Sequence, residues 1–506
     1  MKFSGTLFLL CVLFITVLNG KTLYVSTSGA DTNAGSINLP FKTISKALTA
    51  SIISGDTIYV RGGVYASNAT ITINTSISGK QDMLCHLFAY PGERPLLDYS
   101  SMTFGSSNRG IQLKASFWHI RGFDIKGAGD NGMYIQGSFN IVESCNLYEN
   151  RDGGLQLGGG ANNNKIINCD SYFNSDPTEQ NADGFAPKMD VGTNNYFYGC
   201  RSWQNADDGF DGYLRPRPVN PITTTLDNCW SFMNGYHKDG TIGVGNGNGF
   251  KMGGSDSTNL EHNFILYNCL SFDNRVKGFD QNNNRGSMTL INCSGYRNKS
   301  KNYSVPIALD SGKVLTITNC LVYGPLGVLY NPVLTTNSWM RPDSVTMSDF
   351  VSLDTSGVRG PRKPDGSLPD VTFMHLAPAS QLIDAGTIIP GRMYLGAAPD
   401  LGAFENGLIL GPKNEVNHQV GYYLSNNYPT PFNPSTEIAY QVPVSGHVTL
   451  TIYNLLGKEI LTLVNEEKSA GTYYCTFNAV NLSSGIYFYN LKTDNYSQTK
   501  KMILLK

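Results

Sequence analysis

The feature that most constrains this chain is a short pattern, Cys-x-x-aromatic-x-Asn, that recurs through its middle. Six complete copies begin at Cys145, Cys169, Cys200, Cys229, Cys269 and Cys293, and a seventh copy, at Cys320, lacks the asparagine. Successive cysteines lie 24 to 40 residues apart, so a constant unit is joined by loops of variable length. Periods of this length are typical of a solenoid, in which each repeat stacks only on its neighbours.

The segments between the cysteines predict strands. Short apolar or alternating runs such as 165–169 and 264–269 are followed by Gly or Asn, without helical periodicity. This pattern predicts an all-β chain built on a parallel β-helix, right-handed by the usual crossover preference. Asn at fixed points of each coil tolerates left-handed backbone geometry, and its amide can bond to the Asn above and below.

The repeated cysteines test this interpretation. Ten cysteines in an exported chain would ordinarily suggest disulfides. Equivalent residues of stacked strands, however, lie about 4.8 Å apart with parallel Cβ vectors, whereas a disulfide needs Cβ atoms about 3.8 Å apart and converging. We therefore predict that the seven repeated cysteines form a buried ladder of free thiols, with pairing of some of them as the alternative.

Both ends of the chain differ from the repeats. Residues 1–20, with Lys2 and an apolar run from Leu7 to Leu18, have the pattern of a secretory signal peptide rather than of a membrane anchor. A short helix over 40–48 and a strand over 55–65 are expected to cap the β-helix domain, which spans 21–405.

Beyond the β-helix domain we expect a linker over 406–423 and a small C-terminal β-sandwich over 424–506, with strands at 448–453 and 485–491. The formal net charge is −1 and no Lys/Arg block occurs. We therefore expect no nucleic-acid or acidic-membrane partner. We also expect a monomer.

Carboxylates gather at four Gly-Phe steps, which occupy positions 184/185, 209/210, 249/250 and 278/279. When these steps are superposed as coils of one stack, four aspartates fall in two adjacent layers and one lysine falls in the next. The aspartates are Asp183, Asp207, Asp208 and Asp211, and the lysine is Lys251.

Taken singly, these residues are weak signals, because Asp before Gly is first a turn residue and a lone Lys is usually solvated. Together, four stacked carboxylates repel one another unless a cation compensates them. Oxygen ligands without His or Cys suit a hard ion, and a flexible carboxylate group suits Ca²⁺ better than Mg²⁺. The sequence therefore predicts a calcium site, with a set of turn-forming aspartates as the alternative.

A lysine one coil from bound calcium has a chemical use in the β-elimination of a uronate polymer. The reaction removes the C5 proton beside the C6 carboxylate and expels the C4 glycosidic oxygen. Calcium would neutralise that carboxylate, and a neutral Lys251 would act as the Brønsted base. Gly247, Gly249, Gly253 and Gly254 would leave room beside the lysine for a chain of sugars.

The motifs of this region resemble those of polysaccharide lyase family 9. They are Asn-Ala-Asp-Gly-Phe (181–185), Asp-Asp-Gly-Phe-Asp (207–211), Gly-Asn-Gly-Phe-Lys-Met-Gly-Gly (247–254) and Lys-Gly-Phe-Asp-Gln (277–281). The similarity runs over 21–405 and includes the Gly-Pro-Arg stretch at Arg362. It implies a calcium-dependent pectate lyase that cleaves α-1,4-galacturonan (pectate, polygalacturonate). In it Lys251 would be the catalytic base, and Asp183, Asp207, Asp208 and Asp211 the primary calcium ligands.

The C-terminal segment resembles the sorting domain of type IX secretion cargo, through 427–436, 453–458, 482–487 and the Lys-rich end. This resemblance implies export by the type IX machinery and a secreted or cell-surface location. Two other functions remain as alternatives. A polygalacturonase-type glycoside hydrolase would need a carboxyl acid and an activated water, and the Gly-His-Gly and Arg-Ile-Lys motifs of such enzymes are absent here. A non-catalytic polysaccharide-binding β-helix would bind in the presence of calcium without cleaving.

Overall fold

The computed structural model describes residues 20–505, apart from 216–220, 257–259, 393, 407–422, 425–426, 428–431, 443–445, 469–470 and 494–495. The predicted signal peptide and most of the predicted linker therefore lie outside the described residues. The chain forms two units, a β-helix and a C-terminal β-sandwich.

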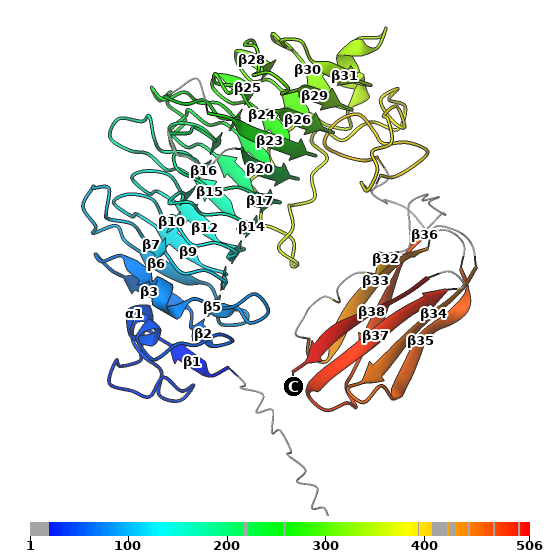
Figure 1. Ribbon diagram of the computed structural model, residues 1–506. Coiled ribbons are helices and arrows are strands. Elements are labelled where there is room, and N and C mark those ends of the chain that lie inside the picture. The colour runs from blue at the N-terminus through cyan, green and yellow to red at the C-terminus, as the bar shows by residue number, and fades with distance from the viewer. Residues whose placement is uncertain are drawn as a thin grey trace, which may run out of the picture.

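Three long parallel sheets form the β-helix, and each coil from β2 to β28 contributes one strand to each sheet (Figure 1). We name the sheets A, B and C. Sheet A consists of β1 (Thr22–Val25), β2 (Thr57–Val60), β5 (Cys85–Ala89), β8 (Trp118–Arg121), β11 (Ile141–Glu143), β14 (Lys165–Ile167), β17 (Asn195–Tyr198), β20 (Ile222–Asp227), β23 (His262–Tyr267), β26 (Met288–Ile291), β29 (Leu315–Thr318) and β31 (Val333–Thr335).

Sheet B consists of β3 (Gly63–Ala66), β6 (Pro95–Asp98), β9 (Asp124–Lys126), β12 (Asn146–Tyr148), β15 (Asp170–Tyr172), β18 (Arg201–Trp203), β21 (Trp230–Phe232), β24 (Leu270–Phe272), β27 (Ser294–Tyr296) and β30 (Leu321–Tyr323). Sheet C consists of β4 (Ile71–Ile73), β7 (Ile111–Leu113), β10 (Met133–Ile135), β13 (Leu155–Leu157), β16 (Phe185–Pro187), β19 (Phe210–Asp211), β22 (Phe250–Lys251), β25 (Lys277–Asp280) and β28 (Lys301–Ser304). The predicted parallel β-helix is confirmed.

The repeat unit begins at the corner between sheets A and B, forms the sheet B strand and ends where the chain turns toward sheet C. Each repeated cysteine is buried and free, so the predicted thiol ladder is confirmed. The residue before the cysteine takes a left-handed conformation in coil after coil, as at Asn168 (φ 52), Asn228 (φ 54) and Asn268 (φ 50). Asn occurs here because its short polar side chain tolerates this backbone conformation better than most residues do.

A second set of asparagines, at the end of the repeat, forms the predicted amide ladder. Asn205 Nδ2 donates to Asn234 Oδ1 at 3.0 Å, and Asn234 Nδ2 donates to Asn274 Oδ1 at 2.9 Å. Each of these Oδ1 atoms also accepts the backbone N–H of the ladder asparagine in the preceding coil. The N–H of Asn205, for example, donates to Asn234 Oδ1 at 3.3 Å. The left-handed turns and the amide ladder thus use different asparagines of each coil.

The N-terminal cap contains α1 (Ile44–Leu48), which buries Ile44, Ala47 and Leu48 against the first coils. The prediction of a single strand over 55–65 is wrong. This segment forms β2 and the start of β3, because Arg61–Gly62 turns the chain from sheet A into sheet B, and Gly63 takes φ 134. The 3₁₀ turn η1 (Thr75–Ile77) follows β4.

After β31 the chain leaves the coils and returns along the outer face of sheet B. This segment contains η2 (Ser338–Met340) and η3 (Met347–Asp349) and otherwise lacks regular structure among its described residues. Its Phe350, Leu368 and Phe373 pack with outward-facing aromatic residues of sheet B such as Phe232 and Phe272. One loop of this segment reaches back beside β14 and β17 (Figure 1).

The C-terminal unit consists of two antiparallel sheets with a shared apolar core, as predicted. One contains β32 (Tyr423–Leu424), β33 (Ser435–Val442) and β36 (Gly471–Asn478), and the other contains β34 (Gly446–Asn454), β35 (Glu459–Lys468), β37 (Gly485–Thr493) and β38 (Tyr496–Leu504). Among the described residues, no helix has the length and apolar character that a membrane span requires.

Candidate active site

The candidate site lies where successive coils turn from sheet B into sheet C. In four successive coils a Gly-Phe step lies at or near the start of the sheet C strand, in β16, β19, β22 and β25, with the ring in the core. Phe210 stacks on Phe185 at 5.1 Å and on Phe250 at 4.9 Å, centroid to centroid. The glycine is required by close packing, because a Cβ on Gly209 would lie 1.9 Å from Ser231 Oγ.

The residue after each inward phenylalanine faces outward and forms a column along the stack. Asp211 pairs in register with Lys251, and Lys251 pairs with Asp280. The neighbours predicted from superposed Gly-Phe steps are therefore the neighbours found. Asp280 carries its own counter-ion, since its carboxylate lies 2.9 Å from Lys277 Nζ.

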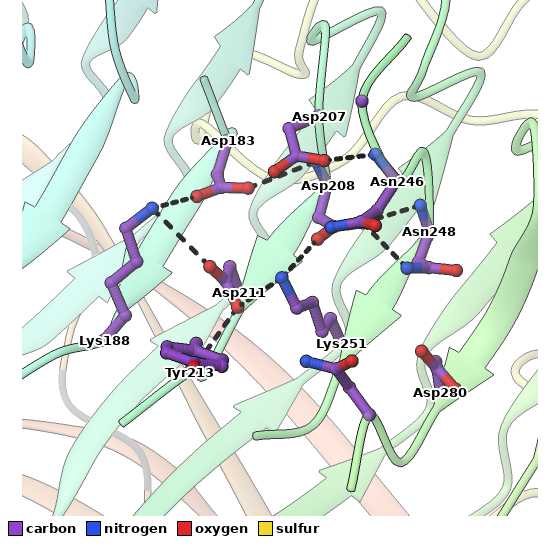
Figure 2. A network of polar contacts seen from close by, with 12 residues as sticks. Asp183, Lys188, Asp207, Asp208, Asp211, Tyr213, Asn246, Asn248, Lys251 and Asp280 are labelled. Carbon is purple, nitrogen blue, oxygen red and sulfur yellow. Dashed lines mark hydrogen bonds and ion pairs between the residues drawn. The ribbon is translucent and has the colours of Figure 1, made fainter. Parts of the chain in front are cut away.

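Three of the four predicted ligands converge. One ligand oxygen from each of Asp183, Asp207 and Asp208 lies within 4.8 Å of the other two, and all three residues are buried (Figure 2). Asp211 lies next to this group, but its carboxylate is directed to two lysines. Its Oδ1 is 3.4 Å from Lys251 Nζ and its Oδ2 is 3.5 Å from Lys188 Nζ.

Backbone and amide donors orient the carboxylates. Asp183 Oδ1 accepts the N–H of Asp208 at 3.1 Å, and Asp207 Oδ1 accepts the N–H of Asn246 at 2.5 Å. Asp208 Oδ1 accepts both the backbone N–H and the side-chain amide of Asn248, at 2.8 and 2.9 Å. These bonds fix one oxygen of each carboxylate and leave the other to face its neighbours (Figure 2).

The buried carboxylates are electrostatically unfavourable without a cation. Burial raises the pKa of Asp207 to about 8, and the neighbouring Asp208 adds to the rise. Burial also raises the pKa of Asp183 well above its usual range. Lys188 opposes this rise, and the charges of Asp211 and Asp207 add to it. At neutral pH these groups therefore require a proton or a cation to be stable where they lie.

The donor set fits calcium. Asp207 Oδ2 is buried and has no hydrogen-bond partner in the part of the chain that the structure describes. Calcium binds carboxylate oxygens at 2.3–2.6 Å, so oxygens within 4.8 Å of one another can share a single ion. No histidine or cysteine belongs to the group, which disfavours zinc and other softer metals.

Lys251 is held as an ammonium ion when only these carboxylates surround it. Its Nζ lies 3.0 Å from Asp208 Oδ2, and the side chain is 8% exposed. Burial alone would lower the pKa of Lys251, but Asp208 and Asp211 outweigh it and raise the pKa well above the usual value. A cation bound among the aspartates would oppose this effect.

Lys188 is a member of the site that the sequence reasoning missed. Its buried Nζ lies 2.5 Å from Asp183 Oδ2 and bridges toward Asp211 (Figure 2). Burial would lower the pKa of Lys188, but Asp183 and Asp211 raise it, so this lysine stays charged. The period of two along a strand could have predicted its position. Lys188 is the third residue after Phe185 and therefore faces outward, as the first residue does.

Tyr213 occupies the equivalent third position one coil later. Its backbone N–H donates to Asp211 Oδ1 at 3.0 Å, and its ring centroid lies 5.7 Å from Lys251 Nζ. The same period predicts it, and in the next coil the position is Gly253. The site therefore has an aromatic ring on one side. On the other side the prediction that Gly253 and Gly254 leave room for sugars is wrong, because a Cβ on Gly253 would lie 2.8 Å from the Asn284 side chain and one on Gly254 would lie 2.1 Å from the Asn282 carbonyl oxygen.

Known protein families match both units of the chain. Residues 23–313 match the family model described as Pel9A-like, right handed beta helix region, and residues 426–505 match the secretion system C-terminal sorting domain. Pectate lyase L of Paenibacillus polymyxa (strain SC2) is 39% identical over 394 residues, which cover 74% of this chain and 85% of that protein. Pectate lyase L of Dickeya dadantii (strain 3937) is 36% identical over 398 residues, or 76% and 90% of the two chains.

Solved structures agree. The crystal structure of pectate lyase Pel9A matches with a TM-score of 0.71 and 35% identity, covering 77% of this chain and 97% of that one. A structure described as rhamnogalacturonan lyase matches with a TM-score of 0.62 and 26% identity, covering 71% and 97%.

Proposed function

Because the chain belongs to the Pel9A-like right-handed β-helix family and is a secreted or cell-surface polysaccharide lyase, we propose that it is a calcium-dependent pectate lyase acting on polygalacturonate. The observation that supports this most is the juxtaposition of buried Lys251 with three converging buried carboxylates, whose oxygens lie within 4.8 Å of one another. A glycoside hydrolase needs no such lysine, and a non-catalytic binding protein would not resemble lyases over most of its length.

In this proposal Asp183, Asp207, Asp208 and Asp211 hold the calcium ion. When bound, the ion supplies positive charge to the uronate carboxylate and so acidifies the adjacent C5 proton. Lys251, as the neutral amine, takes that proton. The C5–H electron pair forms the C4–C5 double bond, the bond from C4 to the glycosidic oxygen breaks, and that oxygen takes up a proton from solvent.

Lys188 has a different role from Lys251, since it stays charged between Asp183 and Asp211. We assign it to positioning: it holds both carboxylates and offsets part of their repulsion. Tyr213 orients Asp211 through its backbone N–H and limits one side of the space above Lys251.

The test is product analysis. Polygalacturonate is incubated with the protein, and the products are separated by chromatography with ultraviolet detection of the C4–C5 double bond. We expect unsaturated oligogalacturonates that disappear with a chelator and return with added calcium. Asp208→Ala should raise the calcium requirement steeply. Saturated products would indicate a hydrolase, and full activity in chelator would exclude the calcium role.

Rhamnogalacturonan is the second substrate to assay, because one solved structure of comparable coverage is described as a rhamnogalacturonan lyase. It has lower identity and a lower TM-score than the pectate lyase structure. We therefore expect faster cleavage of polygalacturonate when both polymers are supplied at equal uronate concentration. The reverse order would keep the elimination mechanism and change the substrate.

A further inference from the structure

A cavity lies at another corner of the β-helix, away from the candidate active site. It has a volume of about 880 Å³ and is formed where the returning loop 359–366 meets the corner between sheets A and B. The candidate active site occupies the other end of the sheet B strands, where they turn into sheet C, and none of its residues lines this cavity. The two places are therefore separate.

One buried arginine, Arg201, and one partly buried arginine, Arg362, form one wall of the cavity and fix the loop. Arg201 binds Asp170 through Nε and Nη2 at 2.9 and 2.6 Å, and its Nη1 donates to the carbonyls of Val358 and Gly360. Arg362, from the loop itself, approaches the same carboxylate at 2.6 Å. Burial would raise the pKa of Asp170, but the two guanidinium groups lower it. One carboxylate thus meets two guanidinium groups, which leaves a net positive charge.

Cations predominate along the whole lining. Six cationic side chains line the cavity against four acidic ones, in a chain whose formal net charge is −1. Arg121 and Arg359 form no ion pair among the described residues. Arg121 lies over the ring of Phe88 at 4.2 Å, and Arg359 donates to Gln204 Oε1 at 2.8 Å. Partial burial lowers the pKa of Arg359, because it disfavours the charged guanidinium. An anion bound beside the guanidinium would compensate for this loss of hydration.

Aromatic rings complete the lining. Tyr90, Tyr172 and Trp203 border the cavity. Tyr172 is held between Tyr148 and Trp203, with centroids at 5.0 and 4.3 Å, so its plane is fixed. Both faces of Tyr172 are therefore covered, as are those of Trp203, which lies between Tyr172 and Phe232. These rings make the wall rigid, and recognition of a uronate rests on the guanidinium groups, which bind carboxylates with paired hydrogen bonds.

We propose that this cavity is a calcium-independent binding site for a stretch of uronate oligosaccharide, separate from the site of cleavage. The volume is that of a small-ligand pocket, so the site takes a short stretch of the polymer rather than a bundle of chains. The assignment rests on the proposed function for its substrate class. Its role would be to retain the polymer while the active site cleaves another part of it.

The test is native electrophoresis of the full chain through gels containing polygalacturonate, with chelator present to remove calcium-dependent binding. Wild-type protein should be retarded. The double variant Arg121→Gln/Arg359→Gln should lose about tenfold or more in apparent affinity, as expected for loss of two charge-assisted contacts. The matched control Lys46→Gln/Lys80→Gln removes two positive charges from exposed positions outside the cavity and should be retarded like wild type.

The outcomes separate this proposal from the proposed function. Equal retardation of wild type and the cavity variant, or an equal loss in the lysine control, overturns the cavity assignment. Displacement of the polymer by inorganic phosphate as readily as by saturated trigalacturonate would show a general anion site and also overturn it. Product analysis of the cavity variant on trigalacturonate should give wild-type turnover. Loss of its unsaturated products there, with the fold intact by thermal unfolding, would count against a separate site.

Discussion

Lys251 must lose a proton to act as a base, yet its surroundings hold that proton. Asp208 and Asp211 raise its pKa in the absence of metal, and a bound cation lowers it again. We therefore expect the rate to rise with pH and the midpoint of that rise to move to lower pH as calcium saturates the site. A rate that falls steadily from about pH 6 to about pH 9 with the fold intact would exclude Lys251 as base.

Replacement of Lys251 separates catalysis from metal binding. Lys251→Ala should lower turnover by about 10² to 10⁴, the usual contribution of a general base. Calcium binding measured by calorimetry should persist, because the lysine is not a ligand. Lys277→Ala is the matched control, since Lys277 also pairs with an outward carboxylate one coil away. Near wild-type turnover in Lys251→Ala would return the hydrolase to consideration.

The raised pKa of Asp207 predicts how the stability of the folded protein depends on pH. Its folded pKa of about 8 lies above that of the unfolded chain. Between about pH 4 and pH 8 the folded state therefore binds the extra proton, and stability falls as pH rises. In chelator, the melting temperature should drop across this window, and calcium should restore it most at the alkaline end.

Asp207→Asn is the control for that prediction, because it keeps the shape and removes the charge. In chelator at pH 8 it should be more stable than wild type, and it should gain less from calcium. Equal calcium stabilisation of both proteins in thermal unfolding would show that Asp207 does not bind the ion.

The residues of the site differed in how far the sequence could predict them. Superposing Gly-Phe steps was enough to place Asp211 beside Lys251, because register in a stack follows from the repeat. The superposed Gly-Phe steps do not indicate Lys188, because it is the third residue after Phe185 rather than the first, although both positions face the same way along a strand. Which oxygen of Asp211 faces which lysine depends on side-chain torsions, and no repeat pattern specifies those.

At the scale of elements, the asparagine ladder joins the coils through buried amides. Asn234 bonds to Asn205 on one side and to Asn274 on the other. Asn234→Ala leaves buried donors on Asn205 without their acceptor, and we expect a loss of stability on the order of 3 kcal/mol. Chemical denaturation measures this difference in the free energy of unfolding. Asn68→Ala, at an exposed turn, should change stability little, and an equal loss in both would contradict the ladder's role.

The returning segment is the element that the sequence described least. The sequence shows the Gly-Pro-Arg stretch as a motif but does not identify the residue that Arg362 binds. That residue, Asp170, lies 192 positions away in the sequence. The repeats are local and can be read from spacing. The contact between Arg362 and Asp170 is long-range and depends on a loop without periodicity.

At the scale of the molecule, the β-helix and the sandwich have separate apolar cores. The residues proposed for catalysis all belong to the β-helix, and the sandwich matches a sorting domain. A chain that ends near Gly407 keeps every residue of both the candidate site and the cavity. It should fold and retain turnover on polygalacturonate, while export from the native host is lost.

Two measurements check this prediction. Turnover and thermal unfolding of the truncated chain should match those of the full chain, because its largest core and its returning segment are intact. Fractionation of the native host should then find the truncated protein inside the cell. A well-folded truncation with reduced turnover on long polymer and normal turnover on trigalacturonate would assign substrate binding to the sandwich. That polymer-specific loss would differ from the loss expected of Lys251→Ala, which should affect both substrates because every cleavage needs the base.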